Sequence, residues 1–129
     1  MVIKMYTELY DITEVKRGDI FYLKPTTQST GSIQHGGRPV VVLQNNIGNK
    51  NSTTTIVAAI TTKCKPRLPV HAQIDLCDDS IRDQRLVGSI ILFEQIFTVN
   101  KSDLIKKIGR ANLWDPDTKA ALLTSLDLQ

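Results

Sequence analysis

The stretch SIQHGGRPVVVLQN, residues 32–45, joins a polar, glycine-containing segment directly to an apolar run. The run at 39–43 (PVVVL) is continuous instead of alternating, which predicts a short strand buried on both faces. Arg38 stands at the entrance to that strand, directly after Gly36 and Gly37. A guanidinium is always charged, matches phosphate oxygens with a planar fork and is costly to bury alone. The stretch therefore predicts either an anion-binding arginine or a structural salt bridge at a strand entrance.

Further strands are expected on either side of this run. Residues 19–23, 54–60, 70–75 and 89–93 have strand composition, and the last continues through 95–99 after a bend at Glu94. Polar loops are expected at 24–37, 45–53 and 76–86. Strict alternation in 70–75 directs Val70, Ala72 and Ile74 inward and His71 outward.

Two helices are expected after the last strand. One is a short helix at 101–108. The other is a C-terminal helix with Asp115 as its N-terminal cap and Pro116 in its first turn, and it carries an apolar stripe of leucines. The stripe consists of Leu122, Leu123 and Leu126. Several short strands and a terminal helix predict a mostly β fold, a small antiparallel β barrel or α+β domain.

Length and charge limit the protein to a few classes. The 129 residues suffice for one domain, and the net charge of +3 with a pI near 9.0 is compatible with a nucleic acid ligand without requiring one. No apolar run reaches the roughly 20 residues of a membrane-spanning helix, and no secretory signal is seen, so a cytoplasmic location is expected. Cys64 and Cys77 lack metal-ligand spacing and are expected to be reduced.

Two other chemistries receive weak support. His35 and His71 invite an acid/base pair because imidazole titrates near neutrality, although an exposed or hydrogen-bonded structural role fits them better. A group of acids follows no metal-ligand spacing and is expected to be a solvated loop, so we expect neither a metal nor another cofactor. The acids are Asp78, Asp79, Asp83 and Glu94.

Five motifs in order resemble the MazF/PemK family of toxins from bacterial toxin–antitoxin pairs. They are VKRGDIFY (15–22), GGRPVVVLQNNIGN (36–49), TTIVAAITTK (54–63), LPVHAQID (68–75) and SIILFEQIFTVNK (89–101). The resemblance implies an SH3-like antiparallel β barrel with a C-terminal helix, in a domain at 15–129 after an extension at 1–14. It also implies a homodimer, metal-independent and sequence-specific cleavage of single-stranded mRNA, and inhibition by a cognate antitoxin protein.

The resemblance assigns the site as well. Arg38 and Thr61 match the family's catalytic arginine and threonine. The ribose 2′-hydroxyl would attack the adjacent phosphorus, Arg38 would stabilise the charge that develops, and Thr61 would donate a hydrogen bond to a nonbridging oxygen. RNA-binding positions implied by the resemblance are Ser32, Gln34, Gly36, Gly37, Thr62, Lys63 and Gln95.

Two positions depart from the family's pattern. Ile33 stands where relatives often carry a glutamate, and Phe97 stands where close relatives carry an arginine. Phe97 offers a stacking surface for a base, or packs in a core or dimer interface. These departures keep two alternatives open: a barrel that binds RNA without cutting it, and a toxin of the CcdB type that poisons a protein target.

Overall fold

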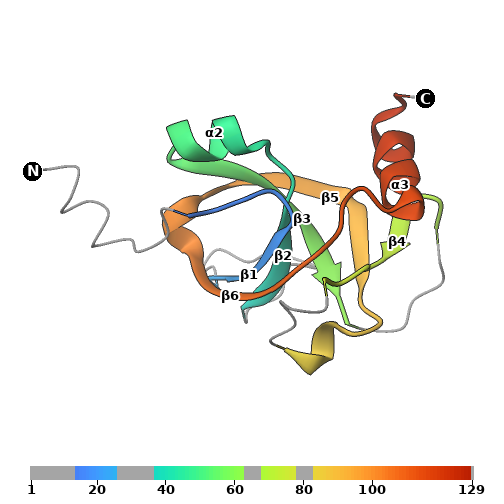
Figure 1. Cartoon of the computed structure of the whole chain (residues 1–129), viewed down its shortest axis with the longest axis horizontal. Coiled ribbons are helices and arrows are strands. Elements are labelled where there is room, and N and C mark those ends of the chain that lie inside the picture. The colour runs from blue at the N-terminus through green and yellow to red at the C-terminus, as the bar shows by residue number, and fades with distance from the viewer. Residues whose placement is uncertain (1–13, 26–36, 63–67, 78–82, 129) are drawn as a thin grey trace, which may run out of the picture.

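The computed structural model of the chain describes residues 14–25, 37–62, 68–77 and 83–128. Its centre is a six-stranded sheet in the order β4-β5-β3-β2-β1-β6, in which every neighbouring pair is antiparallel. Helix α3 packs against β4 and β5 (Figure 1). The strands are β1 Asp19–Leu23, β2 Arg38–Val42, β3 Thr54–Thr61, β4 His71–Gln73, β5 Ile90–Asn100 and β6 Leu104–Arg110. The helices are α2 Asn46–Asn51 and α3 Pro116–Leu126, with short 3₁₀ turns η2 Gln84–Leu86 and η3 Lys101–Asp103. The predicted mostly β fold with a C-terminal helix is confirmed.

Strand β2 is buried on both faces, as its continuous apolar run predicts. Val40, Val41 and Val42 are all 0% exposed. Successive side chains of a strand point to opposite faces. Accordingly, Val41 belongs to one hydrophobic cluster, the first cluster, while Val40 and Val42 belong to another, the second cluster. β2 therefore ties together the two cores of the domain.

The expected bend in the long strand lies at Glu94. Along β3 and β5 the pairing changes from Ala58↔Ile96 to Ala59↔Leu92, so residues 93–95 are extra residues in the ladder. An irregularity of this kind bends a strand and re-aims its side chains. Figure 1 shows β5 rising past α3 and then turning across the sheet.

The prediction of a helix at 101–108 is wrong. Only a single 3₁₀ turn forms, and β6 follows it in antiparallel pairing with β1. The four-residue spacing of the buried Leu104 and Ile108 resembles a helical period. Register shifts in the β1–β6 ladder, which leave Ile105 and Ile108 as extra residues, produce this spacing in a strand.

Helix α3 begins as predicted, whereas its packing face is shifted. The Asp115 carboxylate accepts the backbone N–H of Thr118, which caps the helix, and a proline occupies its first turn. The buried face consists of Thr118 and Ala121, with Leu122 against the first cluster, while Leu126 is 52% exposed. Within the described segments, no helix has the length and apolarity to cross a membrane.

A buried amide fixes α2, which forms inside the stretch expected as a loop at 45–53. Asn49 is fully buried, and its Nδ2 donates to the Gln44 carbonyl at 2.9 Å. Its Oδ1 accepts from Thr55 Oγ1 at 2.6 Å and from Gln44 Nε2 at 3.1 Å. Lys101 Nζ donates to the Asn49 carbonyl at the end of the helix, and burial lowers the pKa of this lysine. Every polar atom of the Asn49 side chain is therefore paired.

We expect Asn49→Leu, which keeps the volume and removes every side-chain hydrogen bond, to lower the free energy of unfolding by at least about 2 kcal/mol. Urea unfolding followed by circular dichroism measures it. Asn51→Ala on the exposed side of the same helix is the control, with an expected change below about 0.5 kcal/mol. Equal effects of the two substitutions would show that the buried network does not stabilise the fold.

Candidate active site

Arg38 is the first residue of β2 and is held there by the pairing of β1 with β2. It lies opposite Leu23, and Pro39 lies opposite Tyr22. Gly37 precedes it where an added Cβ would lie 3.2 Å from the Leu23 carbonyl oxygen. The close approach of the two backbones therefore explains why a glycine occupies this position. Its expected role in admitting an RNA backbone stays a prediction.

Thr61 is the last residue of β3, which is the neighbour of β2 in the sheet. The antiparallel β2–β3 register pairs Val40 with Ala59. Counted two residues on from that pair, Arg38 and Thr61 occupy matching positions at the adjacent ends of the two strands. Both side chains are half-buried, and Thr62 beyond them is exposed.

Gln95 holds the guanidinium. Arg38 Nη2 donates to Gln95 Oε1 at 3.1 Å. Gln95 comes from the bend of β5, so the irregularity of that strand supplies the partner of the arginine. Both residues are site candidates from the family resemblance, but nothing in the sequence predicts that they contact each other. No carboxylate among the described residues forms an ion pair with Arg38, and this disfavours the structural salt bridge within the chain that the structure describes.

The remaining sequence candidates divide into two groups. Phe97 is half-buried and packs against the second hydrophobic cluster, which gives it a packing role. Four RNA-binding candidates fall outside the described residues, as do His35 and Ile33. These four are Ser32, Gln34, Gly36 and Lys63.

His71 does not point outward into solvent as the alternation predicts. It is 7% exposed, its Nδ1 accepts the backbone N–H of Leu68 at 3.3 Å, and its Nε2 lies 2.9 Å from Glu94 Oε2. An Nδ1 that accepts leaves the proton of a neutral ring on Nε2, which then donates to Glu94. The histidine therefore anchors the bend of β5 next to Gln95. Sequence reasoning missed this contact because the two residues lie on different strands.

A charged cluster lies on the neighbouring strand β1. Tyr22 Oη donates to Asp83 Oδ2 at 3.0 Å, Arg85 pairs with the same carboxylate at 2.7 Å, and the Arg85 guanidinium also contacts the tyrosine oxygen. Hydrogen bonds from Arg85 hold the pKa of Asp83 well below its usual range. Burial, then the Asp83 contact, raises the pKa of Tyr22, and the same carboxylate raises the pKa of Arg85. The cluster fastens η2 to β1.

The acids form no metal site in the part of the chain that the structure describes. No group of three histidine, cysteine or acidic side chains is arranged to hold an ion there. Asp78 and Asp79, which belong to the acidic loop, lie outside the described residues.

Residues 16–127 match the model of the PemK-like, MazF-like toxin of type II toxin–antitoxin systems. This chain belongs to that family. The endoribonuclease EndoA of Bacillus subtilis is 46% identical over 97 residues, which cover 73% of this chain and 78% of that protein. The endoribonuclease MazF of Staphylococcus saprophyticus is 42% identical over 95 residues, which cover 73% of this chain and 75% of that protein.

Solved structures share the fold. A mycobacterial endoribonuclease in complex with its cognate antitoxin superposes with a TM-score of 0.66 at 17% identity, covering 90% of this chain and 98% of that one. MazF from Deinococcus radiodurans gives a TM-score of 0.63 at 18% identity, covering 88% and 96%. At these identities the likeness concerns the fold alone.

We expect Asp83→Asn to lower the free energy of unfolding by about 0.5–1 kcal/mol at pH 7. Because the folded-state pKa of Asp83 is depressed, its contribution is complete above the unfolded value near 4 and is lost as the pH falls toward the folded value. The difference in the free energy of unfolding between wild type and variant should therefore become smaller from pH 5 to pH 2.5, as measured by urea unfolding. Asp117→Asn, which changes an exposed acid, is the control. A difference in the free energy of unfolding that stays constant with pH would contradict the electrostatic role of the cluster.

Proposed function

We propose that this endoribonuclease toxin of the MazF-like family cleaves single-stranded mRNA at a short sequence, by transesterification and without a metal ion. The observation that carries the proposal is the placement of Arg38, which donates to Gln95 and stands opposite Thr61 at the ends of two buried strands. Groups at the ends of packed strands are held rigidly enough to act on a phosphate.

The reaction requires stabilisation of negative charge. The ribose 2′-oxygen attacks the adjacent phosphorus and releases its proton to solvent water. The bond to the 5′-oxygen breaks and that oxygen takes up a proton, so the products are a 2′,3′-cyclic phosphate and a 5′-hydroxyl. Arg38 stabilises the charged phosphorane and secondarily provides a proton to the leaving oxygen. A guanidinium stays protonated in proteins, so it cannot accept the proton of the 2′-hydroxyl as a base. Thr61 donates a hydrogen bond to a nonbridging oxygen.

The substrate is held by polar groups around this pair. Gln95, Gly37 and Thr62 are the described members of the proposed RNA-binding set, and they lie on or beside the strands that carry Arg38 and Thr61. The other proposed members are Ser32, Gln34, Gly36 and Lys63. Since Arg38 is already paired with an uncharged amide, its full positive charge remains available to a phosphate.

The proposed partners follow the family. We propose a homodimer in the cytoplasm and neutralisation by a cognate antitoxin, whose acidic segment lies across the RNA site. Support comes from the antitoxin complexes among the solved relatives of this fold. The sequence beyond Thr61 adds Lys63, Lys65 and Arg67, cations suited to an acidic segment as well as to RNA.

The catalytic assignment predicts that substitutions at Arg38 and Thr61 slow RNA cleavage without unfolding the protein. Arg38→Ala should reduce the rate of RNA cleavage by at least about 10²–10³-fold, the cost of losing a positioned donor to a developing anion. Thr61→Val keeps the β-branched shape and removes the hydroxyl, so its cleavage should also fall by about 10²-fold without loss of the fold. The assay is cleavage of a mapped RNA, with circular dichroism of each variant.

The comparison variants lie on β5 and β4 of the same sheet. Gln95→Ala, which leaves Arg38 charged but unanchored, should lower the rate less than removal of the arginine does. Thr98→Val, on an exposed position of β5, should cut at the wild-type rate. His71→Ala, provided that it folds, should retain most activity. A folded Arg38→Ala that cuts at full rate, or an inactive but folded His71→Ala, would contradict the assignment.

A further inference from the structure

A polar cavity lies where the two edges of the sheet approach each other. Leu76, after β4, forms an isolated bridge with Ala111, after β6. The backbone N–H of Cys77 donates to the Arg110 carbonyl at 2.9 Å. Gly18 has a φ of +93°, and an added Cβ would lie only 2.7 Å from the Ala111 carbonyl oxygen. These backbone contacts hold the walls of a cavity of about 470 Å³, a size typical of small-molecule sites.

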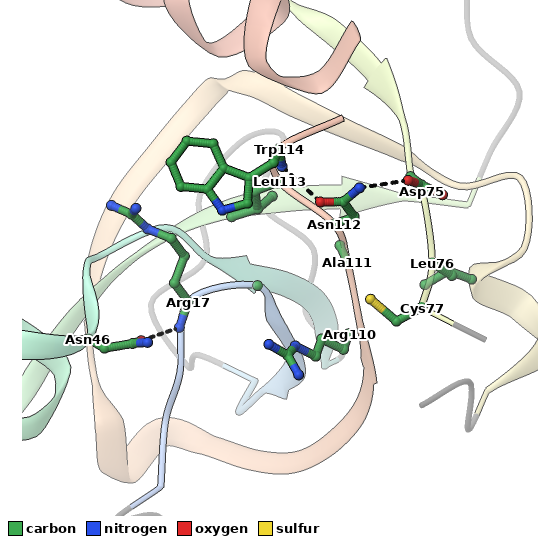
Figure 2. A pocket seen from close by; sticks show the side chains of 11 residues that line it. Arg17, Asn46, Asp75, Leu76, Cys77, Arg110, Ala111, Asn112, Leu113 and Trp114 are labelled. Carbon is green, nitrogen blue, oxygen red and sulfur yellow. Dashed lines mark hydrogen bonds between the residues drawn. The ribbon is translucent and has the colours of Figure 1, made fainter. Parts of the chain in front are cut away.

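Two arginines belong to the wall of this cavity. Arg17 and Arg110 both line it (Figure 2). Arg17 is oriented by its Nε, which donates to the Leu43 carbonyl at 2.9 Å. Neither arginine forms an ion pair with an acid among the residues that the structure describes. Their remaining donors suit a phosphate, which guanidinium groups bind with matched geometry.

An exposed indole completes the same opening. Trp114 is 67% exposed although it is the largest apolar side chain of the cavity wall. Its backbone N–H donates to Asn112 Oδ1 at 3.0 Å, and Lys119 Nζ lies 5.5 Å from the ring centroid. A fixed, solvent-facing aromatic ring is a platform on which a planar base stacks. Trp114 and Arg17 both belong to the cavity wall (Figure 2).

The cavity also carries one acid, which distinguishes between ligand classes. Asp75 accepts from Asn112 Nδ2 at 3.1 Å and lines the wall with it. A second carboxylate entering beside Asp75 would be repelled, which disfavours an acidic peptide. A nucleotide brings a phosphate for the arginines and also base amino or ribose hydroxyl groups that a carboxylate accepts.

We infer that this cavity binds a nucleotide, its base against Trp114 and its phosphate between Arg17 and Arg110. The site is separate from the candidate active site, because Gly18 donates to Val42 at the far end of β2 from Arg38. Four residues of strand correspond to about 13 Å. The nucleotide is either a free mononucleotide or a nucleotide of a bound RNA strand, and only the second source rests on the proposed function.

The experiment uses the fluorescence of Trp114, the single tryptophan of the chain. Titration of the intact protein with AMP and UMP should quench it saturably, whereas uridine, which lacks the phosphate, should bind at least about 10-fold more weakly. Arg110→Ala should weaken AMP binding by about 10–100-fold, and Arg110→Lys should restore part of it. Lys106→Ala removes an exposed cation of the same strand outside the cavity, and should leave the affinity unchanged.

Two further arms identify the source of the nucleotide. Arg38→Ala should quench like the wild type, so the mononucleotide result stands whether or not the chain cleaves RNA. If the nucleotide belongs to RNA, Arg110→Ala should raise the KM for a long substrate and leave a minimal substrate unaffected. If it is free, the KM should stay unchanged for both. Absence of quenching by AMP, UMP and a single-stranded RNA would overturn the inference. So would quenching by a tetraglutamate peptide alone, or AMP binding that Arg110→Ala leaves intact.

Discussion

The burial of β2 on both faces is the constraint on which the remaining structure depends. A strand without a solvent face needs two separate hydrophobic surfaces, and Val40, Val41 and Val42 receive them from two clusters. The sheet must then wrap around the strand from both sides, with β1 and β3 as its direct neighbours. Arg38 is the first residue of this strand, and the pairing with Leu23 of β1 holds its backbone in place.

A chain of contacts then relates the site to the bend in β5. The extra residues 93–95 include two polar side chains, and each contacts a different strand. Glu94 contacts the buried His71 of β4, while Gln95 accepts from Arg38 of β2. The bend therefore serves both packing and positioning.

Much of the fold followed from local patterns, and the errors have identifiable causes. The apolar runs located β1, β2 and β3, and Asp115 located the start of α3. β6 was mistaken for a helix because its irregular pairing with β1 imitates a helical spacing. His71 was placed outward because alternation cannot anticipate a cover supplied by a residue 23 positions away. Arg38 was marked by its neighbours in sequence, whereas its partner Gln95 depends on tertiary structure.

The central claim is that a fixed arginine and a hydroxyl, and no metal ion, carry out the cleavage. The most direct test is to incubate the purified protein with a long single-stranded RNA in EDTA and to determine the chemistry of the new ends. The account predicts undiminished cleavage at one short sequence, with 2′,3′-cyclic phosphate and 5′-hydroxyl ends. Cleavage that stops in EDTA, returns with Mg²⁺ and leaves 5′-phosphate ends would contradict it.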